Sequence, residues 1–108
     1  MNLKDSTELK EFIIKTLEDN KAEDIICFDI GQKTSMAKYM IFASGRSTRN
    51  VSAIATNLTT DLRKQLRMKT NIEGAQGGEW VLVDAGDVIV NIFHPEARER
   101  FKLEERWG

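Results

Sequence analysis

Cysteine, proline and long apolar runs are all scarce in this chain, and each shortage argues against a class of protein. Only one cysteine, Cys27, occurs among 108 residues, so no disulfide can form within the chain, which favours a cytosolic setting. The single proline argues against long extended linkers. No apolar run approaches the ~20 residues that cross a bilayer, and the N-terminus does not resemble a signal peptide. We therefore expect a cytoplasmic protein without a membrane partner.

An excess of positive charge is also missing. The chain has 16 Lys and Arg against 17 Asp and Glu, a net charge of −1. This balance argues against a protein held to RNA mainly by bulk positive charge, although it permits local basic patches. Hydrophobic residues make up 41% of the chain and charged residues 31%, which is typical of a globular protein with a core. The length fits a single domain over residues 1–108.

Hydrophobic periodicity predicts three helices and four strands. Asp5 and Glu8 are spaced like a capping box at the start of the first helix, and Ser47 or Thr48 can cap the second. The expected helices span 5–20, 48–68 and 95–105, and the strands 24–30, 38–43, 80–84 and 88–93. A further short strand is allowed at 70–73. The run at 24–30 is apolar enough for a strand covered on both faces. The order predicts an α/β (α+β) fold with a mixed sheet of about 4–5 strands flanked by helices.

The strand at 80–84 carries the first candidate binding residues. Alternating geometry places Trp80, Leu82 and Asp84 on one face and the two valines on the other. The valine face suits the core, and the tryptophan face suits a contact surface, because tryptophan is enriched among interface hot spots. The alternative interpretation is that Trp80 packs under the C-terminal helix.

An enzymatic interpretation starts from Asp84 and Asp87, which flank a tight turn. Two carboxylates can contribute to a Mg²⁺ site, and the turn Gly45-Arg46-Ser47 before a helix can cradle phosphate. Together they suggest a nucleotidyltransferase-like enzyme. However, the spacing is i, i+3 across a turn rather than two acids on one strand face. The alternative is that both aspartates satisfy backbone groups of the turn.

Four other residues are candidates for binding or chemistry. His94 has no cluster of metal-ligating residues at a suitable spacing, so we expect it to start the last helix. Cys27 has no activating partner in the sequence, and we expect a small core residue. Arg46 and Arg49 begin the second helix, where they either contact RNA phosphates or form a solvated helix start. We expect no metal and no cofactor.

Three segments together resemble one family. The segments are 39–55 (YMIFASGRSTRNVSAIA), 73–90 with Glu-Gly followed by GEWVLVDAGDVIV, and 95–107 with PEAR leading to Leu-Glu and Trp. Their order and spacing are similar to the ribosome silencing factor family, also called Iojap-related, over almost the whole chain. The sequence departs from the family pattern at Lys38, Asn91 and Phe101, where aspartate, histidine and tyrosine are usual. The change at Lys38 reverses a charge, and the other two changes remove a titratable ring and a phenolic hydroxyl.

The resemblance implies binding rather than catalysis, and a nucleotidyltransferase-like topology. Family members dock on the large-subunit ribosomal protein L-fourteen, block the joining of the two subunits and repress translation when nutrients are scarce. On this basis we expect the partner-binding residues to be Trp80, Leu82, Asp84, Arg98, Phe101 and Trp107. A minor contact of ribosomal RNA with Arg46 and Arg49 is compatible with this scheme. The apolar content also permits a homodimer. For Trp107, the alternative is an anchor that holds the C-terminus on its own domain.

Overall fold

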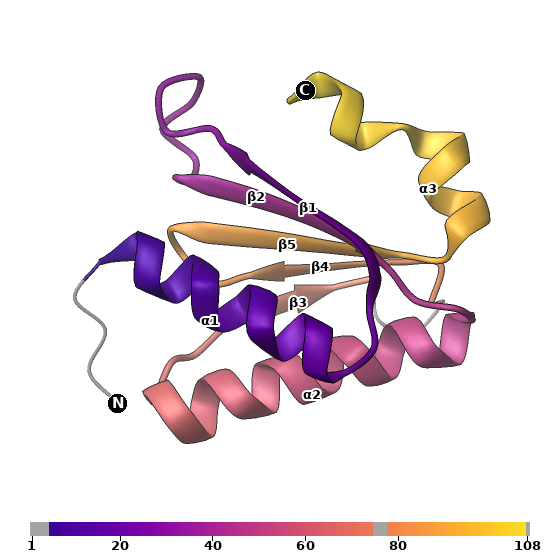
Figure 1. Ribbon diagram of the computed structural model, residues 1–108, viewed down its shortest axis with the longest axis horizontal. Helices are drawn as coiled ribbons and strands as arrows, with labels where there is room; N and C mark the ends of the chain where they lie inside the picture. The colour runs from indigo at the N-terminus through magenta and orange to yellow at the C-terminus, as the bar shows by residue number, and fades with distance from the viewer. Residues whose placement is uncertain (1–4, 75–77, 108) are drawn as a thin grey trace.

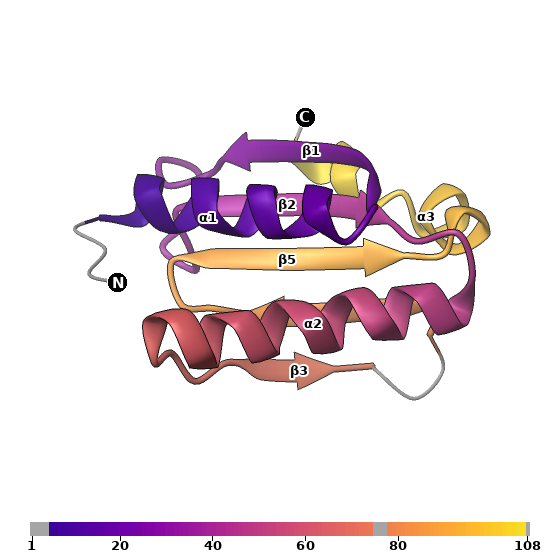
Figure 2. The same cartoon turned by 60° about the horizontal axis from the view of Figure 1, so that its bottom comes forward.

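The computed structural model of the protein describes residues 5–74 and 78–107; of Phe101 it describes only the backbone. Its five strands form one mixed sheet in the order β1-β2-β5-β4-β3, with helices on both sides (Figures 1 and 2). The strands are β1 (Glu23–Asp29), β2 (Tyr39–Ser44), β3 (Asn71–Glu73), β4 (Trp80–Asp84) and β5 (Val88–Phe93). The helices are α1 (Ser6–Asp19), α2 (Thr48–Leu66), α3 (Pro95–Phe101) and the short 3-10 helix η1 (Leu103–Arg106). The expected mixed sheet flanked by helices is confirmed, including the short extra strand.

Strand β5 is the centre of the sheet, because it pairs in parallel with β2 and antiparallel with β4. All six of its residues are buried. Val88, Val90 and Ile92 belong to the core beneath α1 and α2, whereas Ile89 and Phe93 belong to a second core on the other face. Alternation along one strand therefore divides the apolar residues into two layers.

Local sequence explains where α1 and α2 begin. The Asp5 Oδ1 accepts a hydrogen bond from the Glu8 amide at 2.9 Å, and the Ser47 Oγ accepts one from the Asn50 amide at 3.0 Å. Each cap satisfies an N–H group that the helix itself leaves unpaired. Both helices lie on the same side of the sheet (Figure 1). Among the described residues, no helix combines the length and apolarity needed to cross a membrane.

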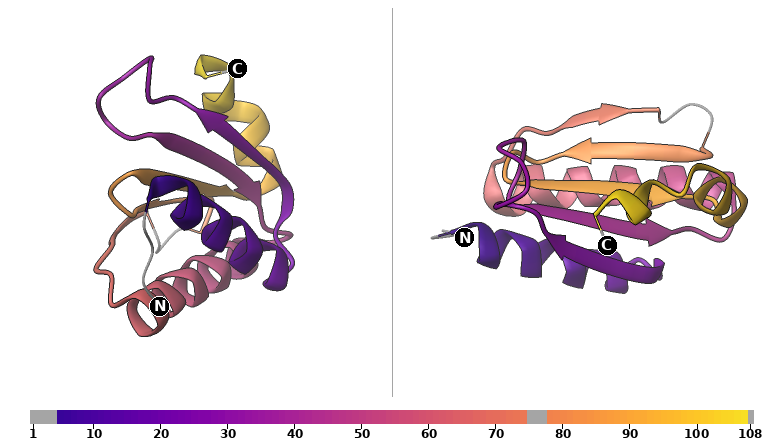
Figure 3. Two further views of the ribbon diagram at one scale, coloured as in Figure 1. Left: turned by 60° about the vertical axis from the view of Figure 1, so that its left-hand side comes forward. Right: turned by 90° about the horizontal axis from the view of Figure 1, so that it is seen from above.

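Two sequence predictions are corrected by the fold. The strand β1 is not covered on both faces but lies at an edge of the sheet, and all of its residues are exposed or half-buried. The last helix ends at Phe101 rather than 105, because Lys102 adopts a left-handed conformation with φ of 50°. The chain then turns into η1 and crosses above the sheet, on the side away from α1 and α2 (Figures 1 and 3).

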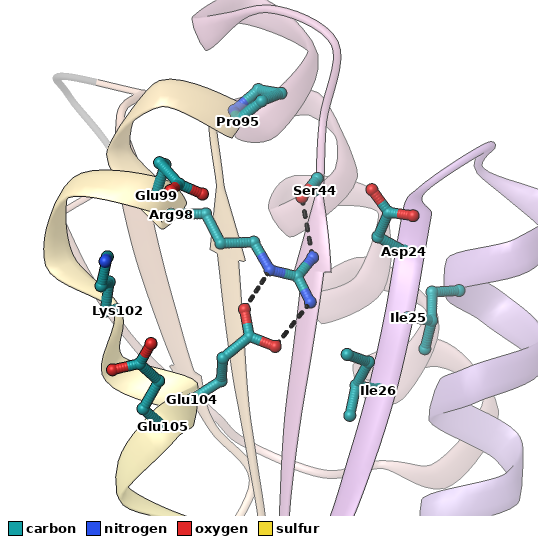
Figure 4. A pocket seen from close by; sticks show the side chains of 10 residues that line it. All are labelled: Asp24, Ile25, Ile26, Ser44, Pro95, Arg98, Glu99, Lys102, Glu104 and Glu105. Carbon is teal, nitrogen blue, oxygen red and sulfur yellow. Dashed lines mark hydrogen bonds and ion pairs between the residues drawn. The ribbon is translucent and has the colours of Figure 1, made fainter. Parts of the chain in front are cut away.

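A half-buried ion pair fixes this turn. The Arg98 Nε and Nη2 donate to the two carboxylate oxygens of Glu104 at 2.6 and 3.2 Å, and Nη1 donates to the Ser44 Oγ at 2.8 Å (Figure 4). The Arg98 side chain is 12% exposed and that of Glu104 25%. A bidentate pair of this kind is stronger than a neutral hydrogen bond. It joins α3, η1 and the end of β2, and we call Lys102–Trp107 the C-terminal strap.

Two glycines with positive φ provide a first test of the packing. A Cβ on Gly78 (φ +70°) would lie 2.5 Å from the Thr48 carbonyl oxygen, whereas a Cβ on Gly86 (φ +79°) would meet nothing within 4 Å. Gly78→Ala should therefore lower the free energy of unfolding by about 2–5 kcal/mol, through conformational strain plus overpacking. Gly86→Ala should cost only about 1–2 kcal/mol, from the backbone conformation alone. Urea denaturation of both variants measures the difference; equal losses would contradict this packing.

A second test concerns the strap. Glu104→Gln leaves the Arg98 guanidinium half-buried beside a neutral amide, and should lower stability by about 1–3 kcal/mol. Hydrogen exchange of the amides from Leu103 to Trp107 should accelerate. The matched control is Glu79→Gln, because the Glu79–Arg100 pair is 60% and 56% exposed. Exposed pairs contribute little, so this control should change stability by less than about 0.5 kcal/mol. Unchanged exchange in the Glu104 variant would show that the ion pair does not hold the strap.

Candidate docking surface

An aromatic row crosses the face of the sheet opposite α1 and α2. Its rings come from four neighbouring strands: Phe28 of β1, Phe42 of β2, Phe93 of β5 and Trp80 of β4. Phe28 meets Phe42 edge-on at 5.9 Å between centroids, and Phe42 stacks on Phe93 at 6.2 Å. Trp80 completes the row by stacking on Phe93 at 5.7 Å. Aromatic contacts at these separations are favourable beyond the area they bury, so the row stiffens this face.

A buried polar residue fixes the orientation of the tryptophan. The Trp80 Nε1 donates to the Asn91 Oδ1 at 3.0 Å, and the Asn91 amide group lies 3.0 Å from the Met40 sulfur. Asn91 is 3% exposed, so its hydrogen bonds are shielded from water and are strong. The Trp80 indole is therefore held on both its ring face and its N–H, which makes it a rigid anchor.

A groove of about 200 Å³ lies between this face and the C-terminal strap. It is apolar except for one amide and one guanidinium, and it contains no carboxylate. The lining residues are Met36, Met40, Phe42, Trp80, Leu82, Ile89, Asn91, Leu103, Arg106 and Trp107. An apolar depression with two tryptophans has the chemistry of an interface hot spot that accepts an apolar side chain.

The structure brings together three of the six predicted partner-binding residues. Trp80, Leu82 and Trp107 all line the groove, and the predicted alternation along β4 is confirmed, since Val81 and Val83 are fully buried in the other core. Trp107 also packs against the second core, and its carbonyl oxygen accepts from the Lys33 Nζ at 3.0 Å. It therefore anchors the C-terminus and lines the groove at once.

The other three lie differently. Asp84 is half-buried at the end of β4 and its Oδ1 accepts from the Gly86 amide at 2.9 Å, which is the turn role expected as an alternative. Arg98 is occupied by Glu104 and Ser44, so it positions the strap rather than facing the groove. The Phe101 side chain lies outside the described residues, and its assignment stays a prediction.

Some groove residues were missed by sequence reasoning. Met40 and Asn91 face the groove because they alternate with core residues on β2 and β5. The alternation applied to Trp80 would have found both of them. Leu103 and Arg106 reach the groove only because the chain reverses at Lys102, a conformation that nothing in the local sequence indicates.

The topology contradicts the phosphate-cradle interpretation, because it separates the turn at Gly45-Arg46-Ser47 from the two aspartates. Gly45-Arg46-Ser47 follows β2 at the end of the sheet where Ser44 pairs with Phe93, whereas Asp87 contacts Lys38 at the opposite end. The length of β5 separates them, about 17 Å at 3.3 Å per residue. The Arg46 amide is also taken by the Asn50 side chain. Among residues 5–74 and 78–107, no group of three or more His, Cys, Asp or Glu is placed to hold a metal ion.

The remaining candidates have ordinary surroundings. The His94 Nδ1 accepts from the Glu96 amide at 3.4 Å, which confirms a helix-start role. Cys27 is half-buried against the core beneath α1. Burial raises the pKa of its thiol, opposed by nearby Lys10 and reinforced by Asp29, so the reactive thiolate is disfavoured. Arg46 and Arg49 are exposed at the start of α2.

Comparisons with known proteins identify the family of this chain. The family model described as ribosomal silencing factor during starvation matches residues 3–108. The ribosomal silencing factor RsfS of Zymomonas mobilis is 38% identical over 104 residues, covering 96% of this chain and 78% of that protein. The RsfS of Haemophilus influenzae is 40% identical over 100 residues, covering 93% and 98%.

A solved structure has the same fold as this chain. The crystal structure of a protein from Chromobacterium violaceum superposes with a TM-score of 0.92 at 40% identity, covering 97% of this chain and 88% of that one. The family model and the identities extend over nearly all of the sequence. This chain therefore belongs to the ribosomal silencing factor family.

Proposed function

We propose that this chain acts as one silencing-factor domain that binds the large ribosomal subunit at ribosomal protein L-fourteen and blocks the joining of the small subunit. Translation is thereby repressed when nutrients are scarce. It acts by binding and not by catalysis, and it needs no cofactor. Its place of action is the cytoplasm, where the ribosomes are. Membership of the family supports an action on the ribosome, and the groove beneath the strap is the observation that carries the docking site.

The groove is suited to a partner protein rather than to a small substrate. Its volume of about 200 Å³ is below the range of roughly 300–1,000 Å³ usual for ligand pockets. A stable interface buries roughly 800 Å² on each partner, about one eighth of the 6648 Å² accessible surface. We place Trp80 at the centre of the interface, with Leu82 and Trp107 beside it and Asp84, Arg98 and Phe101 toward the rim.

Obstruction follows from the dimensions of the molecule. Its extents are 36 × 31 × 20 Å, so even the shortest axis is 20 Å. A rigid body of this thickness on the joining surface of one subunit keeps the other beyond the few ångströms at which packing and hydrogen bonds form. No chemistry is needed for the effect.

The docking site is tested by replacing the anchor. Trp80→Ala should weaken binding to purified large subunits by at least about 30-fold, the effect of losing a hot spot worth about 2 kcal/mol. Since Trp80 also stacks on Phe93, Leu82→Ser is measured alongside it and should weaken binding without removing the aromatic row. Ile14→Ala is the matched control, because Ile14 is a half-buried apolar residue of α1 that packs against the core on the other side of the sheet. If both groove variants fold and bind like the wild type, the docking site is elsewhere.

The blocking mechanism is tested by a subunit-joining assay. Purified subunits are mixed with increasing protein, and joined ribosomes are measured by light scattering or sedimentation. Joining should fall in proportion to occupancy and cease at saturation, and Trp80→Ala should shift the curve to higher concentration. A homodimer formed through the groove would hide it, so the protein is first shown to be monomeric at the concentrations used. If the two subunits still join completely at a saturating concentration of the protein, the proposed mechanism is wrong.

A further inference from the structure

Charge is unevenly distributed along a chain that is almost neutral overall. Residues 45–70 contain six cations and one carboxylate, Asp61, a net charge of +5. The rest of the chain holds ten cations and sixteen carboxylates, a net charge of −6. The positive part coincides with α2 and the segments next to it. The overall charge of −1 therefore conceals one strongly basic element.

The arginines of α2 and of its C-cap share one side of the helix. At about 100° per residue, positions 49, 56, 60, 63 and 67 fall on one side, away from the buried Leu58 and Leu62. This side carries arginines toward both ends and threonines between them, and no carboxylate. We call the set Arg49, Arg63, Lys64, Arg67 and Lys69 the α2 flank; all five are exposed.

The C-terminal part of the flank, at Arg63 and Lys69, lies beside the β3 edge of the sheet. Beside its C-terminal part, a groove of about 380 Å³ is lined by Thr59, Arg63, Met68, Lys69, Thr70, Asn71 and Ile72. Hydroxyl, amide and cationic groups line it, again with no carboxylate. By contrast, the pocket around Arg98 (Figure 4) contains the four carboxylates of Asp24, Glu99, Glu104 and Glu105. The groove beside β3, which we call the basic groove, therefore suits an anion, whereas the pocket around Arg98 does not.

Contacts within the protein explain only part of the positive charge of the flank. In the described part of the chain, no carboxylate lies within 4.0 Å of Arg63, Lys64, Arg67 or Lys69. Interaction with the helix dipole accounts for Arg63 and Lys64 in the last turn. It does not account for Lys69, which lies beyond the helix, or for Arg49, which lies at the end that disfavours cations.

We propose that the α2 flank contacts the sugar–phosphate backbone of ribosomal RNA next to the docking site; this rests on the proposed function. Arginine and lysine bind phosphates without reading sequence, and hydroxyl and amide groups add contacts to phosphate and ribose oxygens. The flank and the docking surface meet at the β3 edge: β3 pairs with β4, which carries Trp80 and Leu82, and also lines the basic groove. Figure 2 shows β3 at the edge of the sheet, next to α2. A subunit surface that fills the apolar groove can therefore continue around this edge onto the flank.

The test measures binding against salt concentration. Arg63→Gln, Arg67→Gln and Lys69→Gln are combined in one variant, with Lys15→Gln, Lys21→Gln and Lys38→Gln combined as a control of equal charge change. These three lysines are exposed and lie outside α2. Affinity for purified large subunits, for isolated ribosomal protein L-fourteen and for a short labelled RNA duplex is measured at several salt concentrations. Each phosphate contact contributes about 0.9 to the slope of log K against log salt for a duplex.

We expect the flank variant to bind large subunits about tenfold or more weakly at low salt, with a slope smaller by about two to three. It should bind the isolated protein like the wild type and the RNA duplex more weakly. The control should match the wild type throughout. Unchanged subunit affinity and slope would overturn the proposal. Weaker subunit binding with equal RNA binding would also overturn it, in favour of an acidic protein surface. If the wild type binds neither subunits nor the isolated protein, the proposed function fails, and the RNA duplex alone decides whether the flank binds RNA.

Discussion

The burial of β5 on both of its faces is the constraint on which the rest of the structure depends. One side of the strand is covered by α1 and α2, and the other carries Phe93, on which Phe42 and Trp80 stack. Because a strand alternates its side chains, the same six residues supply a core and the floor of the proposed docking surface. The proposed docking surface is thus continuous with the hydrophobic interior, and it shares the rigidity of a close-packed core.

The strap gives this surface its depth. Without Leu103 and Trp107 the sheet face would be an open apolar patch, and such patches are aggregation liabilities as well as binding sites. The Arg98–Glu104 pair holds the strap over part of the face and leaves a groove. The ion pair between α3 and η1 therefore shapes the apolar groove between the strap and the sheet. The two surfaces used in our proposals differ accordingly: the groove is shaped by packing, whereas the α2 flank is defined by charge.

Periodicity predicted the elements well because it reports burial directly. Trp80, Val81 and Leu82 alternate in the sequence as they do in the sheet, and Asp5 and Ser47 cap the helices as their positions suggest. What periodicity could not supply was the order of strands, so the edge position of β1 was missed despite its apolar composition. The reversal at Lys102 was also missed, because a non-glycine residue rarely takes a left-handed conformation. The Arg98–Glu104 pair and the Trp80–Asn91 pair form only in the folded structure. The spacing of these residues in the sequence could therefore not have revealed them.

The position of β5 has a consequence for how the chain folds. The antiparallel pairs β1–β2 and β3–β4 are close in the sequence, but the strand that joins them is the last to be synthesised. Its parallel partner β2 precedes it by roughly 50 residues, so the contacts that unite the two halves are of high contact order and form late. Until then, both hairpins on an emerging nascent chain expose the edges that β5 will occupy. Folding of this small protein is therefore completed from its C-terminal quarter, and loss of that quarter removes the centre of the sheet rather than its margin.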